Sequence, residues 1–304
     1  MNANKSAVQP AQPFSAWMAA VQSTMEQALS SLLPAAASTP QQLHQAMRYA
    51  VLDGGKRVRP LLAFAAGELF AAEPEQLQRA AAAVEMIHAY SLVHDDMPCM
   101  DDDALRRGKP TVHIKFGQAS ALLAGDALQA QAFLVLSEGG GDAACKLAMV
   151  RLLAQASGSL GMCGGQAIDL ASVGLQLSRQ QLEQMHRLKT GALLRAAVLL
   201  GALSGKLLTA GEEQALDRYA AAVGLAFQVV DDILDATADS ATLGKTAGKD
   251  AADNKPTYVS ILGLEASQAL AQQLRQDAHL AILPFGDKAQ RLRELADLIV
   301  QRKA

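Results

Sequence analysis

The sequence predicts an all-α protein built as one large helix bundle. Half of its 304 residues are hydrophobic and only 4% are aromatic. Ala, Leu and Gln, which form helices readily, dominate throughout, whereas β-branched and aromatic residues are sparse. No Gly- or Pro-rich linker divides the chain, and no repeat of fixed period is present. We therefore expect residues 1–304 to form a single domain, with a flexible start over residues 1–12.

Turn and cap signals place the helices in order. The first helix ends before Pro34, the glycine pair Gly54-Gly55 stops the second, and Pro74 opens the fourth. Apolar residues at a 3.6-residue period fill the stretches between such signals. The expected helices span about residues 14–33, 41–52, 61–69, 74 to the acidic run at 94–103, 117–137, 143–171, 179–203, 212–235, 260–283 and 288–300.

The charge and cysteine content exclude several classes of protein. The net charge is −3 and no strongly basic face is evident, so nucleic acid is not an expected partner. The three cysteines, Cys99, Cys145 and Cys163, lack metal-ligand spacing and suit a reducing compartment. Residues 1–12 lack the apolar core of a signal peptide, and no uninterrupted apolar run reaches the roughly 20 residues that span a bilayer. We expect a cytoplasmic protein without stable membrane insertion.

An acidic run at residues 94–103 is the strongest chemical feature. Five carboxylates lie within nine residues, and such crowding is unfavourable unless a cation shares it. Mg²⁺ and similar hard ions suit an all-oxygen cluster. Asp95 and Asp101 would lie about 120° apart on a regular helix. Because Pro98 removes a backbone donor and crowds the preceding turn, we expect a bulge or break near residues 97–99 that returns Asp101 to the side of Asp95.

A second acidic group lies inside another apolar helix. Asp231 and Asp235 are four residues apart, so they lie about 40° apart on one face. Two acidic groups on two apolar helices indicate metal ions held between them. By contrast, Asp126 and Asp169 are lone acids on apolar helices, and we interpret both as structural.

Cationic residues gather in two short segments. The turn before the third helix carries Lys56, Arg57 and Arg59. Backbone N–H groups at a helix start, together with such side chains, can bind phosphate, although a solvated basic turn is an equal alternative. Arg106 and Arg107 follow the acidic run directly. They either bind anions with their planar guanidinium groups or form salt bridges with the neighbouring carboxylates.

Other polar residues interrupt apolar segments. His88 lies about two turns before the acidic run, as a hydrogen-bonded core residue or as a ligand. Lys189 and Thr190 sit in mid-helix, where a single Lys usually reaches solvent and a Lys-Thr pair facing the carboxylates would be functional. Small residues at 161–165 either allow close helix packing or leave room for a ligand. The Gly- and Lys-rich loop at 243–250 is suited to close over a phosphate as a lid.

These features predict a site for apolar substrates that carry phosphate groups. The cations exceed what one phosphate group needs, and the surrounding helices are apolar. Metal ions and cations stabilise a departing diphosphate, and a water-poor apolar cavity lets a carbocation survive. The sequence has no Walker-type glycine loop, nucleophile elbow or zinc motif, which argues against an ATPase, a hydrolase or a metalloprotease.

In this combination and order, the motifs resemble those of the trans-prenyl diphosphate synthases, most closely the bacterial members that form farnesyl diphosphate. The resemblance covers nearly the whole chain, without a departure in a catalytic motif. It rests on Gly54 to Pro60, His88, Asp95, Asp96, Asp101, Arg106 to Gly108, Lys189, Thr190, Gln228, Asp231, Asp232, Asp235, Lys245 and Lys255. It implies an isoprenoid-synthase bundle with a central active-site cavity, a homodimer, and a prenyltransferase that condenses isopentenyl diphosphate with dimethylallyl and then geranyl diphosphate.

The resemblance also implies a role for each side chain. Three Mg²⁺ ions would be bound by Asp95, Asp101, Asp231 and Asp235. The allylic diphosphate would be held and ionised by Arg106, Lys189, Thr190, Gln228, Lys245 and Lys255. Isopentenyl diphosphate would be held by Lys56, Arg59, His88 and Arg107. Oxygen atoms of Thr190, Gln228 and the Lys189 carbonyl would face the cation, and the released diphosphate would take the final proton.

The same resemblance bears on product length. Tyr90 and Ser91 would line the floor of the cavity, and the bulky Tyr90 resembles the pattern of enzymes that stop at a C15 product. A geranyl or geranylgeranyl diphosphate synthase is the nearest alternative. A terpene cyclase would not need a second diphosphate site, and a non-catalytic partner subunit typically lacks one of the two acidic groups.

Overall fold

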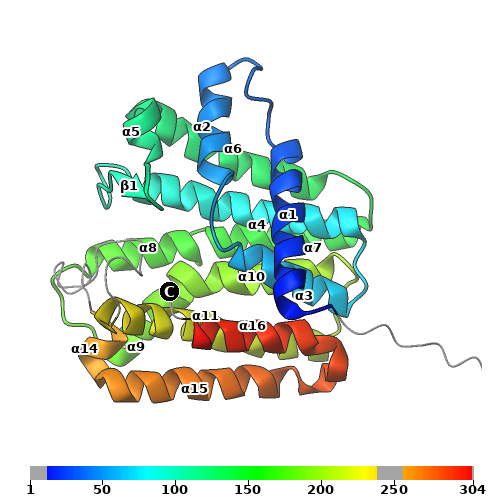
Figure 1. Cartoon of the computed structure of the whole chain (residues 1–304), viewed down its shortest axis with the longest axis vertical. Coiled ribbons are helices and arrows are strands. Elements are labelled where there is room, and N and C mark those ends of the chain that lie inside the picture. The colour runs from blue at the N-terminus through cyan, green and yellow to red at the C-terminus, as the bar shows by residue number, and fades with distance from the viewer. Residues whose placement is uncertain (1–11, 238–255, 303–304) are drawn as a thin grey trace, which may run out of the picture.

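Helices make up nearly all of the regular structure, which confirms the predicted all-α class (Figure 1). The computed structural model describes residues 12–237 and 256–302, so the expected flexible start lies almost wholly outside it. Within these ranges the strands are β1 (Leu105–Arg106) and β2 (Lys109–Pro110). The helical elements are α1 (Phe14–Leu32), α2 (Gln41–Val51), α3 (Val58–Leu69), α4 (Pro74–Asp95), α5 (Val112–Phe116), α6 (Gln118–Ser137), α7 (Ala143–Ser157), α8 (Met162–Ala171), α9 (Arg179–His186), the π-helix η1 (Arg187–Gly191), α10 (Ala192–Leu203), α11 (Ala210–Thr237), α14 (Tyr258–Leu262), α15 (Leu264–Ala281), the 3₁₀-helix η2 (Leu283–Ala289) and α16 (Gln290–Gln301).

The helices stack in layers. In Figure 1, α4 and α6 pack along each other in the upper half of the bundle, and α10 packs below them against α3 and α4. Helix α11 contacts α10 on one side and α15 on the other. This arrangement places α4, which carries the first acidic run at its end, and α11, which carries the second acidic group, on two sides of α10.

Small residues allow the central helices to approach closely. Residues 80–84 of α4 are inaccessible to solvent, as is most of α10, so these stretches are buried on all sides rather than along one stripe. Gly201 of α10 lies directly on α3, because a Cβ atom added to it would come within 2.0 Å of the Ala63 carbonyl oxygen. The contact between these two backbones therefore requires glycine at position 201.

A smaller apolar cluster holds the second half of α11. It is formed by α9, α11, α14 and α15, with Leu182, Val229, Tyr258 and Leu274 among its members. Tyr258 begins α14, and its backbone N–H donates to the Asp232 carboxylate at 2.7 Å. Asp232 thus fixes the start of α14 against α11.

Two helices that the periodicity predicted as continuous are broken in the structure. The segment 143–171 forms α7 and α8, which are separated by a turn from Gly158 to Gly161. The segment 260–283 forms α14 and α15, which meet at Gly263 with φ of 82°. Glycine adopts this left-handed backbone without the steric penalty of a Cβ atom. Apolar periodicity continues across both breaks, which is why it did not reveal them.

A short hairpin, absent from the predicted elements, follows the acidic run. Leu105 pairs with Pro110 and Arg106 with Lys109. The two turn residues, Arg107 and Gly108, have φ of 53° and 74°. Positive φ at both central residues is typical of the type I′ turn that joins hairpin strands. The hairpin therefore determines the directions of Arg106 and Arg107.

Among the described helices, α6 alone is long and apolar enough to cross a membrane by length and composition. The same properties occur in core helices of other folds, and α6 packs here against α2, α4 and α7.

We expect Gly201→Ala to lower the free energy of unfolding by about 1–3 kcal/mol, because the new methyl group would overlap the Ala63 carbonyl and force α3 and α10 apart. Urea unfolding would measure the loss. Gly211→Ala is the matched control, since nothing lies within 4 Å of a Cβ atom there. The control should be neutral or stabilise by up to about 1 kcal/mol. Equal losses in both variants would contradict the packing argument.

Candidate active site

A cavity of about 330 Å³ lies where the ends of several helices meet. It brings together seven residues that the sequence assigned to a site: Arg59, His88, Tyr90, Ser91, Asp95, Lys189 and Thr190. Apart from His94 and Gln166, its other walls are apolar or sulfur-containing side chains, including Leu92, Met97, Leu122 and Met162. The cavity therefore joins a charged region to an apolar one, as a substrate with a charged head and a greasy tail requires.

The first acidic run folds back on itself. Helix α4 ends at Asp95, and the N–H of Asp101 donates to the Asp95 carbonyl at 2.9 Å. The N–H of Asp102 donates to the Met97 carbonyl at 3.2 Å. The break occurs at Asp95 and Asp96, slightly before the predicted residues 97–99. It has the predicted consequence that Asp101 returns to the side of Asp95.

Burial raises the pKa of Asp95 to about 6. The nearby Lys189 ammonium group opposes this rise, whereas the Asp101 carboxylate adds to it. Asp95 thus lies near both a cation and a like charge. A further cation at this position would relieve the repulsion between the two carboxylates.

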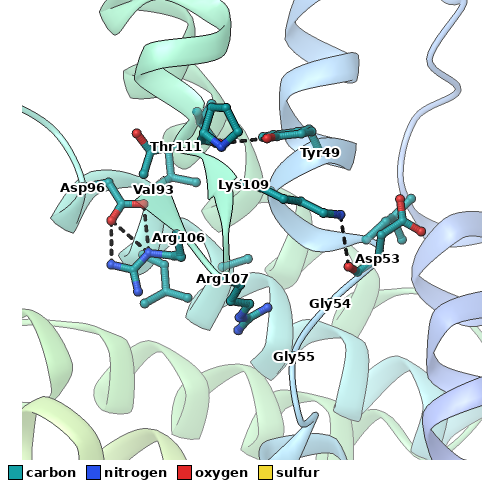
Figure 2. A pocket seen from close by; sticks show the side chains of 16 residues that line it. Tyr49, Asp53, Gly54, Gly55, Val93, Asp96, Arg106, Arg107, Lys109 and Thr111 are labelled. Atoms are coloured by element: carbon teal, nitrogen blue, oxygen red, sulfur yellow. Dashed lines mark hydrogen bonds and ion pairs between the residues drawn. The ribbon is translucent and has the colours of Figure 1, made fainter. Parts of the chain in front are cut away.

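The buried Asp96 carboxylate forms an ion pair with the partly exposed Arg106, shown in Figure 2. The Arg106 Nε atom lies 2.9 Å from each carboxylate oxygen, and Nη2 lies 2.5 Å from Oδ1. The sequence had grouped Asp96 with the other acids of the run. In the structure its charge is compensated by Arg106, which also lines a neighbouring pocket of about 200 Å³. Of the two alternatives for Arg106, salt bridging is therefore present, and any anion that it binds must share it with Asp96.

The three cations of the basic turn have different environments. Arg57 is 5% exposed and donates to Glu85 at 2.8 Å, to Glu26 at 2.9 Å and to the Val51 carbonyl at 2.7 Å. Lys56 is exposed, and Arg59 lines the cavity. Arg57 is thus a structural residue that anchors the turn. This separation explains why two of three adjacent cations can serve a ligand while the third cannot.

Arg59 and His88 line this cavity and Arg107 lines the neighbouring pocket, and the three form a group of donors with little anionic compensation. Burial lowers the pKa of Arg59 and of Arg107, and the Glu85 carboxylate opposes both shifts. Burial, followed by the charge of Arg59, holds the pKa of His88 well below its usual range. The Arg107 guanidinium lies over Gly55, where an added Cβ atom would be 2.7 Å from Nη1. An anion bound here would offset the positive potential of the group.

The second acidic group is held by residues from the end of the chain. Asp231 forms an ion pair with Arg302, whose guanidinium also donates to the Phe227 carbonyl at 2.9 Å and lies 4.1 Å from the Phe227 ring centroid. Asp235 is buried one turn further along α11. Arg302 is not among the site residues predicted from the sequence, because it lies 71 residues from its partner.

The π-helix η1 contains the Lys189-Thr190 pair. Wide turns of this kind are frequent at functional sites. The Lys189 ammonium lies 2.5 Å from the Asp169 carboxylate, and the Thr190 hydroxyl donates to the Gln228 side-chain oxygen at 2.6 Å. Asp169, interpreted from the sequence as structural, therefore contacts a predicted site residue. Lys245 and Lys255 lie outside the described residues, as does the loop at 243–250.

The carboxylates do not form a closed metal cage. Across residues 12–237 and 256–302, no three Asp, Glu, His or Cys side chains gather closely enough to hold one ion. Mg²⁺ commonly binds through one or two carboxylates and completes its shell with water and substrate phosphates. This shared coordination suits the pairs Asp95 with Asp101 and Asp231 with Asp235 better than a site in which the protein supplies every ligand.

Comparison with known proteins agrees with this arrangement. Residues 40–281 match the family described as polyprenyl synthetase. The chain is 50% identical to farnesyl diphosphate synthase of Escherichia coli strain K12, over 85% of this chain and 88% of that protein. It is 48% identical to farnesyl diphosphate synthase of Haemophilus influenzae, over 96% and 99%. A crystal structure of an FPP/GFPP synthase from Zymomonas mobilis superposes with a TM-score of 0.85 at 41% identity, over 94% and 98%.

Replacing Arg57 with Met should lower the free energy of unfolding by about 3–5 kcal/mol, because Glu85 would be left buried without its cation. Chemical denaturation would measure this effect. Lys206→Gln removes an exposed ion pair with Glu212 and serves as the control, with an expected loss of at most about 1 kcal/mol. A loss for Arg57→Met no larger than that of the control would show that the buried pair does not anchor the turn.

Burial lowers the pKa of His186 to about 4, from an ordinary value of 6.5. The unfolded chain therefore binds a proton between these values that the folded chain does not. Stability should fall as the pH decreases from about 6.5 to about 4, by about 1–3 kcal/mol from this group. His186→Phe, which can keep the ring stacked on Tyr258, should flatten this part of a pH series of urea unfolding curves. Tyr258→Phe, which keeps both His186 and the stacked ring, is the control and should retain the pH dependence; an equal flattening there would contradict the assignment.

Proposed function

Because the chain belongs to the polyprenyl synthetase family, we propose that it condenses isopentenyl diphosphate with dimethylallyl diphosphate and then with geranyl diphosphate, giving (2E,6E)-farnesyl diphosphate. The observation that carries this proposal is a single cavity lined by Arg59, His88, Asp95 and Lys189 at its charged end and mostly by apolar side chains elsewhere. Two relatives that are 50% and 48% identical are named farnesyl diphosphate synthase, which supports the C15 product.

Lys56, Arg59, His88 and Arg107 would bind the diphosphate of isopentenyl diphosphate. Electrostatics supports this assignment. Arg59 and Arg107 are buried, and nearby carboxylates do not fully compensate their positive charges. His88 stays neutral among these cations and can donate one hydrogen bond without adding charge. Arg57 and Glu85 hold the turn that carries Lys56 and Arg59.

Arg106, Lys189 and Lys245 would bind the diphosphate of the allylic substrate, and Lys255 would help to close the site. Arg106 and Lys189 are each held by a carboxylate, so they are oriented before the substrate arrives. The oxygens of Thr190 and Gln228 and the Lys189 carbonyl would face the positive charge that develops when the diphosphate leaves. The double bond of isopentenyl diphosphate then attacks, and the released diphosphate accepts the final proton.

Asp95, Asp101, Asp231 and Asp235 would hold Mg²⁺ ions, three in number, together with the substrate diphosphate. When bound, these ions neutralise the charge that builds up on the leaving diphosphate. The raised pKa of Asp95 supports a need for a cation on that side of the cavity. On the other side, Asp231 would exchange its Arg302 partner for an ion.

Tyr90 would limit the length of the product. Its side chain is buried, lines the cavity and meets the His94 ring edge-on at 5.7 Å. The neighbouring Ser91 also lines the cavity, and its hydroxyl donates to the His88 carbonyl at 2.9 Å. A bulky residue on the last full turn of α4 before Asp95 would stop a chain that grows along this helix.

The proposal also includes that the protein forms a homodimer in the cytoplasm. Helix α6 exposes Leu123 and Leu134, and Leu147 is exposed on the adjacent helix α7. Exposed leucines on neighbouring helices suit an interface between two copies of the chain. The free thiols of Cys99, Cys145 and Cys163 suit a reducing compartment.

The first test is a product assay with isopentenyl diphosphate, dimethylallyl diphosphate and Mg²⁺. We expect a C15 product that disappears when the metal is chelated. A C10 or C20 main product would favour the geranyl or geranylgeranyl alternative. No product with any allylic starter would favour a non-catalytic partner subunit.

In the same assay, Tyr90→Ala should shift the products to C20 and longer, because the floor of the cavity is removed. Tyr90→Phe keeps the bulk of the ring and is the matched control, which should still give C15. Identical product lengths from all three proteins would refute the assignment of Tyr90 as the floor.

A further inference from the structure

Gln166 on α8 has a buried side-chain amide without a partner. Neither Nε2 nor Oε1 is accessible to solvent, and neither makes a hydrogen bond within the described part of the chain. Folded proteins pair the great majority of such groups, since a buried polar atom without a partner is unfavourable. A ligand that enters the neighbouring cavity can supply the missing partner.

The position of Gln166 identifies which end of a ligand it would meet. Met162, Cys163 and Gln166 line the cavity from one face of α8, and Asp169 follows on the same face one turn later. Asp169 holds the Lys189 ammonium at 2.5 Å. Because side chains three residues apart are neighbours on a helix, Gln166 lies beside this ion pair, next to the charged end of the cavity.

The backbone of α8 holds Gln166 at this position. A Cβ atom added to Gly165 would lie 2.1 Å from the backbone nitrogen of Lys189, so α8 packs directly on η1. This contact keeps the Gln166 backbone beside η1. Rotation of the side chain about its own bonds then suffices to turn the amide toward a ligand next to Lys189 and Thr190, which line the same cavity.

We propose that Gln166 binds the diphosphate of the allylic substrate, with its side-chain N–H group donating to a phosphate oxygen. The inference rests on the proposed function and adds one substrate contact to it. A carboxamide suits this place because it donates a hydrogen bond without adding a second positive charge next to Lys189. The apolar tail of the substrate could not satisfy the amide, whereas a diphosphate can.

The test uses the full chain and two probes in the presence of Mg²⁺. One probe is inorganic diphosphate, and the other is geranyl S-thiolodiphosphate, a sulfur-bridged analogue that resists ionisation. Calorimetric titration should show that Gln166→Met weakens both probes about tenfold, which corresponds to about 1.4 kcal/mol. Gln166→Glu should weaken both further, because a carboxylate would repel the phosphate oxygens.

Thermal unfolding without ligand separates this role from a purely structural one. Gln166→Met removes an unpaired amide, so its Tm should be unchanged or higher by about 2–4 °C. Gln131→Met is the matched control, because the Gln131 amide donates to the Leu32 carbonyl at 2.9 Å. The control should lower Tm and leave both affinities unchanged. If Gln166→Met does not fold, Gln166→Asn, which withdraws the amide by one methylene group, replaces it.

Unchanged affinity for both probes in the Gln166 variants would overturn the inference. Weaker binding of the thiolo analogue alone would also overturn it, because the contact would then lie along the hydrocarbon tail. A failure of the unmodified chain to bind either probe would overturn the proposed function together with this inference. Weaker binding of both probes by the Gln166 variants, with normal binding by the control, would support it.

Discussion

Charge compensation inside an apolar helix bundle is the constraint on which the site depends. A charge that leaves water must be paired, and the bundle meets this requirement with Arg57 and Glu85 in the turn that carries Arg59. Arg106 with Asp96 and Lys189 with Asp169 follow the same rule. Each of these pairs fixes a cation close to the cavity. Under the proposed function, contacts that belong to the folding of the protein thereby orient these cations for a polyanionic ligand.

Several of the predicted site residues lie where the helices are irregular. In a regular helix, backbone groups are used internally and side chains lie at fixed angles. Helix α4 ends at Asp95 so that Asp101 can return beside it. The π-turn at Lys189 and Thr190 and the hairpin turn at Arg107 likewise aim side chains in directions that a continuous helix would not allow. The regular helices hold these three irregular segments in position. The small residues between α3 and α10 allow these two helices to pack in direct contact.

Some elements of the fold could be predicted from the sequence, and others could not. Periodicity predicted α1, α2 and α6 within a few residues, since each is bounded by Pro or Gly and keeps one pattern throughout. The same reasoning missed the breaks at Gly158 to Gly161 and at Gly263, because an apolar pattern can continue through a change of direction. Pro98 correctly indicated that the acidic run leaves the helix. It did not indicate that the buried Asp96 carboxylate would be paired with Arg106.

The sequence by itself determined the helical class, the two acidic groups, the basic turn and the family to which their combination belongs. These properties follow from residue types and short spacings, which are local. Only the tertiary structure decided which charges are partners: Arg57 with Glu26, 31 residues away, and Asp231 with Arg302, 71 residues away. It also decided that Asp169 meets Lys189 and that the Gln166 amide has no hydrogen-bond partner among the described residues. The physical reason is that such contacts depend on how closely separate helices pack, and periodicity along one helix carries no information about its distance from another.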